Sequence, residues 1–88
     1  MKITITDLND AHEIVKIAES YKNYDFDCVC GRYTIDLKSI MGVLSLGLPK
    51  NVDIIARSLD DDHIESDDAV YEKFTKWSNK HGENKWQK

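Results

Sequence analysis

The sequence is poor in the features that mark several large classes of protein. It has one proline, two cysteines and no apolar run of the length that a membrane-spanning helix needs. Its net charge of -4 excludes the basic excess that is typical of nucleic-acid-binding proteins. Residues 1–6 alternate in polarity and lack the apolar segment of a signal peptide. We therefore expect a cytoplasmic protein with neither a nucleic-acid nor a membrane partner.

Cysteine is scarce, and its spacing excludes most of its usual roles. Cys28 and Cys30 lie two positions apart in a predicted strand, so both side chains point to one face. A disulfide between such neighbours would close a small, strained loop. Without a second cysteine pair, a zinc site has little support. We expect both thiols to be reduced and mostly buried, and the sequence predicts no metal and no cofactor.

Hydrophobic residues make up 41% of the sequence. Where they alternate with polar residues, they predict four strands. Gly31 and Arg32 separate the second and third of these strands and predict a tight hairpin turn. The expected strands are 2–6, 24–30, 33–37, and a fourth whose inward face carries Val52, Ile54 and Ala56.

Helical spacing of apolar residues predicts three helices. The first covers about 10–22, with Asp7 or Asn9 as its N-cap, and the second is short and begins after Ser39. The third has Ser66 as a candidate cap, a buried stripe of Val70, Phe74 and Trp77, and Gly82 as its end.

The order β-α-β-β-α-β-α predicts an α+β fold with the helices on one face of an antiparallel sheet. We expect a single domain over 1–82, followed by a frayed tail over 83–88.

The segment Leu37-Lys38-Ser39-Ile40-Met41-Gly42, followed by Leu44-Ser45-Leu46-Gly47, resembles the regulatory-serine region of HPr. HPr is the histidine-containing phosphocarrier of the bacterial sugar phosphotransferase system. The resemblance extends more loosely from Lys2 to about Gly82. It implies an open-faced β-sandwich with the sheet order 1-4-2-3, and a carrier protein that is not an enzyme.

The resemblance breaks at the start of the first helix. In the family, a histidine there carries the phosphoryl group, and an arginine and a proline complete the site. Matching the buried faces of the elements places these three positions on Asp7, Asn9 and Asp10. Aligning His12 with the family's histidine instead would turn polar side chains into the core. The resemblance therefore implies a degenerate phosphoacceptor site.

The second helix keeps the family's pattern. The resemblance implies that Ser39 is a candidate for regulatory phosphorylation, and that Ile40, Met41 and Leu44 dock onto a protein partner. That partner would be a phosphotransferase-system enzyme, a regulatory kinase or a transcription regulator. Our hypothesis is a regulatory or protein-binding module that acts through this helix. The alternative is a phosphocarrier that uses Asp7 or His12 as a non-standard phosphoacceptor.

Overall fold

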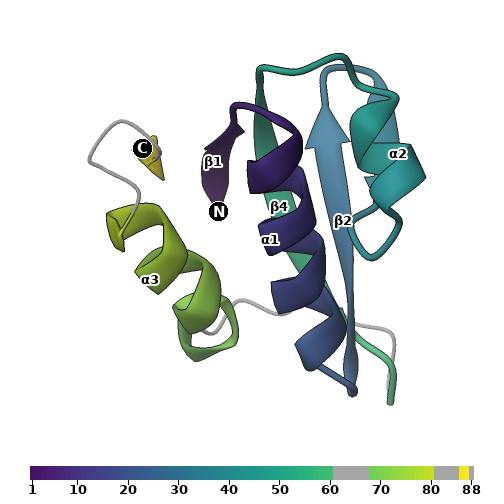
Figure 1. Ribbon diagram of the computed structural model, residues 1–88. Helices are drawn as coiled ribbons and strands as arrows, with labels where there is room; N and C mark the ends of the chain where they lie inside the picture. The colour runs from purple at the N-terminus through teal and green to yellow at the C-terminus, as the bar shows by residue number, and fades with distance from the viewer. Residues whose placement is uncertain (61–67, 81–85, 88) are drawn as a thin grey trace.

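A computed structural model of the chain describes residues 1–60, 68–80 and 86–87 (Figure 1). These residues form strands, α-helices and one short 3-10 helix, η1. In chain order the elements are β1 (Lys2–Ile5), α1 (Leu8–Ser20), β2 (Tyr24–Cys30), β3 (Tyr33–Asp36), α2 (Ile40–Leu44), β4 (Lys50–Ser58), η1 (Asp68–Tyr71), α3 (Glu72–Lys80) and β5 (Trp86–Gln87).

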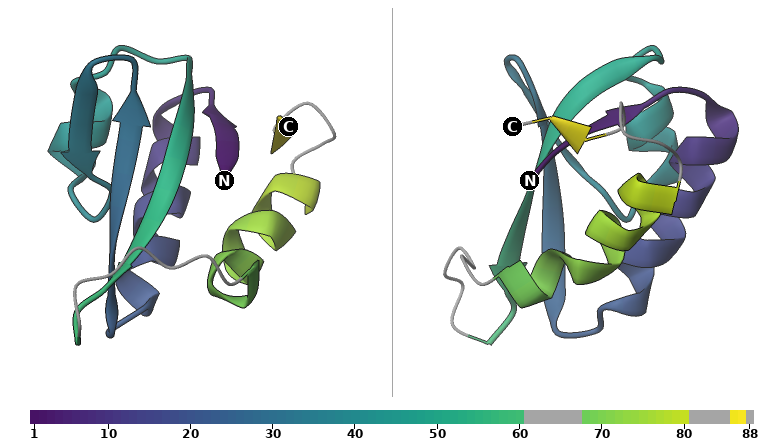
Figure 2. Two further views of the ribbon diagram at one scale, coloured as in Figure 1. Left: turned by 180° about the vertical axis from the view of Figure 1, so that it is seen from behind. Right: turned by 90° about the vertical axis from the view of Figure 1, so that its left-hand side faces the viewer.

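The strands form one sheet in the order β3-β2-β4-β1-β5, with antiparallel pairing between neighbours. The predicted order 1-4-2-3 is confirmed. Ile3 lies opposite Val52, and Phe26 lies opposite Ala56, so these buried side chains gather on one face of the sheet. The side view in Figure 2 shows α1 and α3 covering this face. The predicted α+β fold is therefore confirmed.

Strand β5 lies in the tail that the sequence predicted to be frayed. Lys2 pairs with Gln87 and Ile3 pairs with Trp86, so the prediction is wrong for these two tail residues. Their backbone groups pair with an edge of β1 that would otherwise be open. A strand of two residues is too short to show an alternating pattern, which explains why the sequence did not reveal it.

Helix α1 packs one apolar stripe against the sheet. It begins after the N-cap Asp7, two residues before the predicted start, and its last residue is Ser20 rather than Lys22. The predicted buried stripe is confirmed, and its members are Ala11, Ile14, Val15 and Ala18.

Helix α3 follows directly on η1. The predicted stripe of Val70, Phe74 and Trp77 is buried, as expected. The indole Nε1 of Trp77 donates a hydrogen bond to Oε1 of Glu13 at 2.8 Å, which joins α3 to α1. The predicted cap Ser66 and the predicted helix end Gly82 lie outside the described residues.

The two cysteines occupy different environments on β2. Both thiols are free, as predicted, and Cys28 is fully buried, but Cys30 is only half-buried. Burial, reinforced by the nearby Cys30, raises the pKa of the Cys28 thiol to about 12. Cys28 is therefore a small core residue rather than a reactive thiol.

Candidate functional site

The N-terminus of α1 is closed by two carboxylates. Asp7 has an extended backbone, and its Oδ1 accepts a hydrogen bond from the Asp10 backbone N–H at 2.9 Å. Oδ2 of Asp10 accepts from the Thr6 backbone N–H at 3.0 Å. Asp10 is only 6% exposed, so this arrangement is partly shielded from water. Two backbone N–H groups that an anion would otherwise use are thus satisfied by the chain's own acids.

The other polar residues near this end of α1 are exposed. Asn9 lies in the first turn and His12 in the second, because the helix begins earlier than predicted. His12 is off the buried stripe that includes Ala11 and Ile14, as the sequence indicated. The structure thus brings Asp7 and Asp10 together, whereas Asn9 and His12 face solvent.

Helix α2 is capped by Ser39. Its Oγ accepts a hydrogen bond from the Gly42 backbone N–H at 3.2 Å, and its carbonyl accepts from Val43 N–H at 3.1 Å. The segment that follows the helix turns at Gly47, whose φ of 76° lies in the left-handed region that favours glycine. The predicted N-cap is therefore confirmed.

The apolar residues of α2 divide between the core and the surface. Val43 is fully buried and anchors the helix. Ile40 and Leu44 are half-buried against the core, while the Met41 side chain is 75% exposed. Polar residues would be expected at such a position in a helix that only covers a core. Met41 and its two neighbours thus form a small apolar surface, which we call the α2 face.

Asp7 and Ser39 cap two different helices, α1 and α2. Lys38, just before α2, donates from Nζ to the backbone oxygen of Tyr21 at 3.0 Å, beyond the last turn of α1. This bond joins the segment before α2 to the residue that follows α1. Asp7 and Ser39 each accept a hydrogen bond from the first turn of their own helix.

The comparison with protein families gives one match that covers most of the chain. The model PTS-HPr, described as "PTS HPr component phosphorylation site", matches residues 6–75. The chain belongs to the PTS HPr family. The matched segment includes both the capped start of α1 and all of α2. Neither the search of curated proteins nor that of solved structures found a match.

Membership in the HPr family indicates the general class of function. Members of the family are phosphocarriers rather than catalysts, and they interact with phosphotransferase-system proteins. None of the helices within residues 1–60 and 68–80 combines the length and apolar character needed to cross a bilayer. The remaining question is which of the two regions, the start of α1 or the α2 face, acts in this HPr-like chain.

Proposed function

We propose that this HPr-like protein is a regulatory or protein-binding module that acts through the α2 face, without a phosphoryl-carrying histidine. The exposure of Met41 next to Ile40 and Leu44 carries the proposal. Its partner would be a phosphotransferase-system enzyme, a regulatory kinase or a transcription regulator. The proposal includes a cytoplasmic location, where Cys28 and Cys30 would stay reduced.

The chemistry at the start of α1 opposes a phosphohistidine. In the alignment that the resemblance to HPr implies, Asp7 would stand at the phosphoacceptor position and Asn9 at that of the family's arginine. A phosphoryl group is stabilised by cationic donors and free N–H groups, and the helix dipole adds only about 0.3–1 kcal/mol at an exposed site. The Asp7 and Asp10 carboxylates already accept the nearby N–H groups and place negative charge there. This region would repel the charge that a carrier has to hold.

The chemistry of the α2 face suits a protein partner. Methionine is flexible and polarizable, and it is enriched at interfaces, where it adapts to the opposing surface. Val43 holds the helix on the core, so Met41 is presented from a fixed backbone. Ser39 lies at the edge of the same face, where a phosphate would add charge beside an apolar contact. We propose that phosphorylation of Ser39 regulates binding.

The carrier function is tested directly by incubation with phosphoenolpyruvate and a phosphotransferase-system Enzyme I. We expect no phosphorylated product by mass spectrometry, while a histidine-containing HPr in the same reaction is labelled. A labelled product would support the alternative carrier that uses Asp7 or His12. Asp7→Asn and His12→Gln would then identify the acceptor, since an acyl phosphate is labile in base and a phosphohistidine is labile in acid.

The α2 face is tested with matched variants in a pull-down from cytosol. Met41→Asp places a charge in the face, and we expect it to abolish capture of any protein that wild type retains. Leu59→Asp is the control, because Leu59 is also exposed (53%) but follows β4 at the end opposite Lys50. Equal loss of binding with both variants, or no loss with Met41→Asp, would contradict a role for α2.

A further inference from the structure

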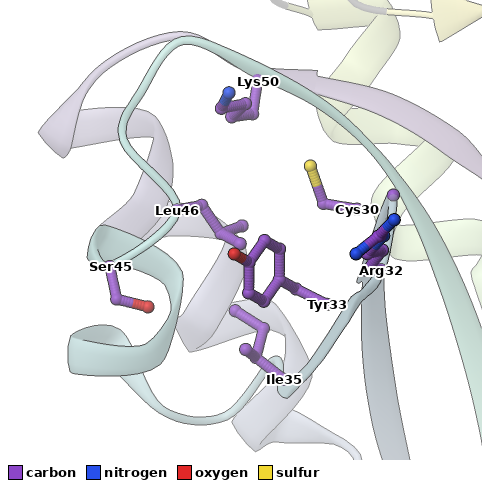
Figure 3. Close-up of a pocket in the computed structure, with 8 residues that line it drawn as sticks. Cys30, Arg32, Tyr33, Ile35, Ser45, Leu46 and Lys50 are labelled. Carbon is purple, nitrogen blue, oxygen red and sulfur yellow. The ribbon is translucent and has the colours of Figure 1, made fainter.

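A pocket lies between the β2–β3 hairpin turn and the segment that leads from α2 into β4 (Figure 3). Its volume is about 480 Å³, within the range of about 300–1,000 Å³ that small-molecule sites occupy. The lining residues that matter here are Cys30, Arg32, Tyr33, Ser45, Leu46 and Lys50. Apart from Ser45, these residues lie outside the α2 helix and its cap, and none belongs to the α2 face.

The pocket is cationic in a chain of net negative charge. Arg32 and Lys50 both line it, and among the described residues no carboxylate does so. Within residues 1–60, 68–80 and 86–87, neither side chain has an ion pair or hydrogen bond. Lys38, Arg57 and Lys76 each have an acidic partner instead. Two uncompensated cations at one concave site attract an anion.

The backbone fixes the two positions, in different parts of the chain, from which these cationic side chains extend. Arg32 follows Gly31, whose φ of 58° is that of a tight turn, at the tip of a hairpin where Cys30 pairs with Tyr33. Lys50 pairs with Ile5 at the start of β4. Side chains on a fixed backbone lose less freedom on binding than those on a loose loop.

The rest of the pocket is mainly apolar. Figure 3 shows the Tyr33 ring beside Leu46, and the Cys30 thiol pointing into the cavity towards Lys50. Ser45 already donates its hydroxyl proton to the Gly42 carbonyl at 2.6 Å, so that proton is not available to a ligand. The Tyr33 side chain is 68% exposed, and its ring forms an open wall. An apolar wall next to two cations fits a ligand with an anionic head and an apolar body.

We infer that this pocket binds a small organic anion. One phosphate or carboxylate group lies between Arg32 and Lys50, and an apolar or aromatic body packs against Tyr33 and Leu46. Charge-assisted hydrogen bonds hold the head, and burial of the body adds affinity that a bare ion lacks. The inference does not rest on the role proposed for the α2 face.

Titrations followed by amide NMR test the inference with four probes: phenyl phosphate, benzoate, benzamide and inorganic phosphate. We expect saturable shifts centred on Gly31, Arg32 and Leu46 with phenyl phosphate or benzoate. Benzamide lacks the charge and inorganic phosphate lacks the body, so both should bind at least about tenfold more weakly. Comparison of the two binding probes shows which head group is preferred. No saturable shifts with either organic anion would overturn the inference.

Matched charge variants distinguish binding in the pocket from general electrostatic attraction of an anion to the protein. The double variant that combines Arg32→Gln and Lys50→Gln should bind the tighter of the two organic anions at least about tenfold more weakly than wild type does. The control, Lys16→Gln with Lys80→Gln, removes the same charge from exposed positions of α1 and α3. It should change affinity less than about twofold. Equal weakening by both double variants would overturn the site.

Cys30 provides a second readout. Because it lines the pocket while Cys28 is buried, alkylation of the native protein should label Cys30 first. The tighter of the two organic anions should slow this labelling in wild type and in the control double variant, but not in the pocket double variant. Labelling that the bound probe leaves unchanged would contradict occupancy of this cavity.

Discussion

Asp7 and Asp10 close the start of α1 by two hydrogen bonds that run in opposite directions along the chain. Asp7 accepts from the backbone of Asp10, and Asp10 accepts from the backbone of Thr6. The geometry is close to that of a capping box, in which the N-cap and the third helical residue satisfy backbone N–H groups reciprocally. Negative charge at this end of α1 also complements the helix dipole. Asp7 therefore has a structural role as the N-cap of α1.

Removing this cap should destabilise the protein. We expect Asp7→Ala to lower the free energy of unfolding by about 0.5–2 kcal/mol, because the Asp10 N–H loses its acceptor. Asp7→Asn should cost less, since an amide oxygen can accept the same bond. Urea denaturation measures both effects.

Asn9→Ala is the control for this series. Asn9 is exposed in the first turn of the same helix, so its replacement should change stability by less than about 0.5 kcal/mol. If Asn9→Ala cost as much as Asp7→Ala, the cap would have been assigned to the wrong residue.

Pattern alone was sufficient for most of the fold. The alternation around Ile3 and Ile5 places β1, and the helical spacing of Ala11 and Ile14 places α1, because burial imposes periods of two and 3.6 residues. The place of Ser39 before an apolar run predicts its role as a cap. The sheet order 1-4-2-3 needed the resemblance to HPr, since periodicity does not say which strands pair.

Other features depended on tertiary contacts that no local pattern reveals. Asp7 and Asn9 are equally good N-cap residues by type. The hydrogen bond from the Thr6 backbone to Asp10 favours Asp7 as the cap. Arg32 and Lys50 are 18 positions apart in sequence, yet the pairing of β2 with β4 and of β1 with β4 brings them to one pocket. Each residue in isolation is typical of an exposed turn.

Stability should fall at high pH because of Cys28. Its pKa is raised from 9.0 to about 12 in the folded protein by burial and by Cys30. Above pH 9 the unfolded chain loses this proton while the folded chain keeps it, so the unfolded state is favoured as pH rises towards 12. Below pH 9 both the folded and the unfolded chain hold the proton, so Cys28 adds nothing to the pH dependence of the free energy of unfolding.

Unfolding free energies measured between pH 8 and 10.5 check this prediction. Wild type should lose stability more steeply than Cys28→Ala, although the variant starts lower because it leaves a cavity. Cys30→Ala, which keeps the buried thiol, should retain most of the slope. Identical slopes for wild type and Cys28→Ala would show that Cys28 does not titrate in this way.

The hydrogen bond from Trp77 to Glu13 should contribute measurably to the packing of α3 on α1. The indole N–H donates to a carboxylate at 2.8 Å, so the bond is charge-assisted. Because Trp77 is buried, the bond is also partly shielded from water. In a double-mutant cycle of Trp77→Phe and Glu13→Gln, we expect a coupling energy of about 0.5–2 kcal/mol. Strict additivity of the two changes would indicate that the contact contributes nothing beyond burial.

Ser39 separates a structural role from a regulatory one. Ser39→Ala should lower the free energy of unfolding by about 0.5–2 kcal/mol, because Gly42 N–H loses its acceptor. Ser39→Asp keeps an acceptor at the N-cap and complements the helix dipole, so folding should be nearly unchanged. Thermal or urea unfolding of the three proteins measures this.

The same aspartate should act differently on binding. It places a charge at the edge of the face formed by Ile40, Met41 and Leu44, and a partner would have to desolvate that charge without pairing it. Once a partner has been captured, titration against wild type and Ser39→Asp should show weaker binding by the variant, despite its intact fold. Ser39→Ala, which adds no charge, should bind nearly as wild type does. Equal affinities for wild type and Ser39→Asp would leave Ser39 as a helix cap without a regulatory role.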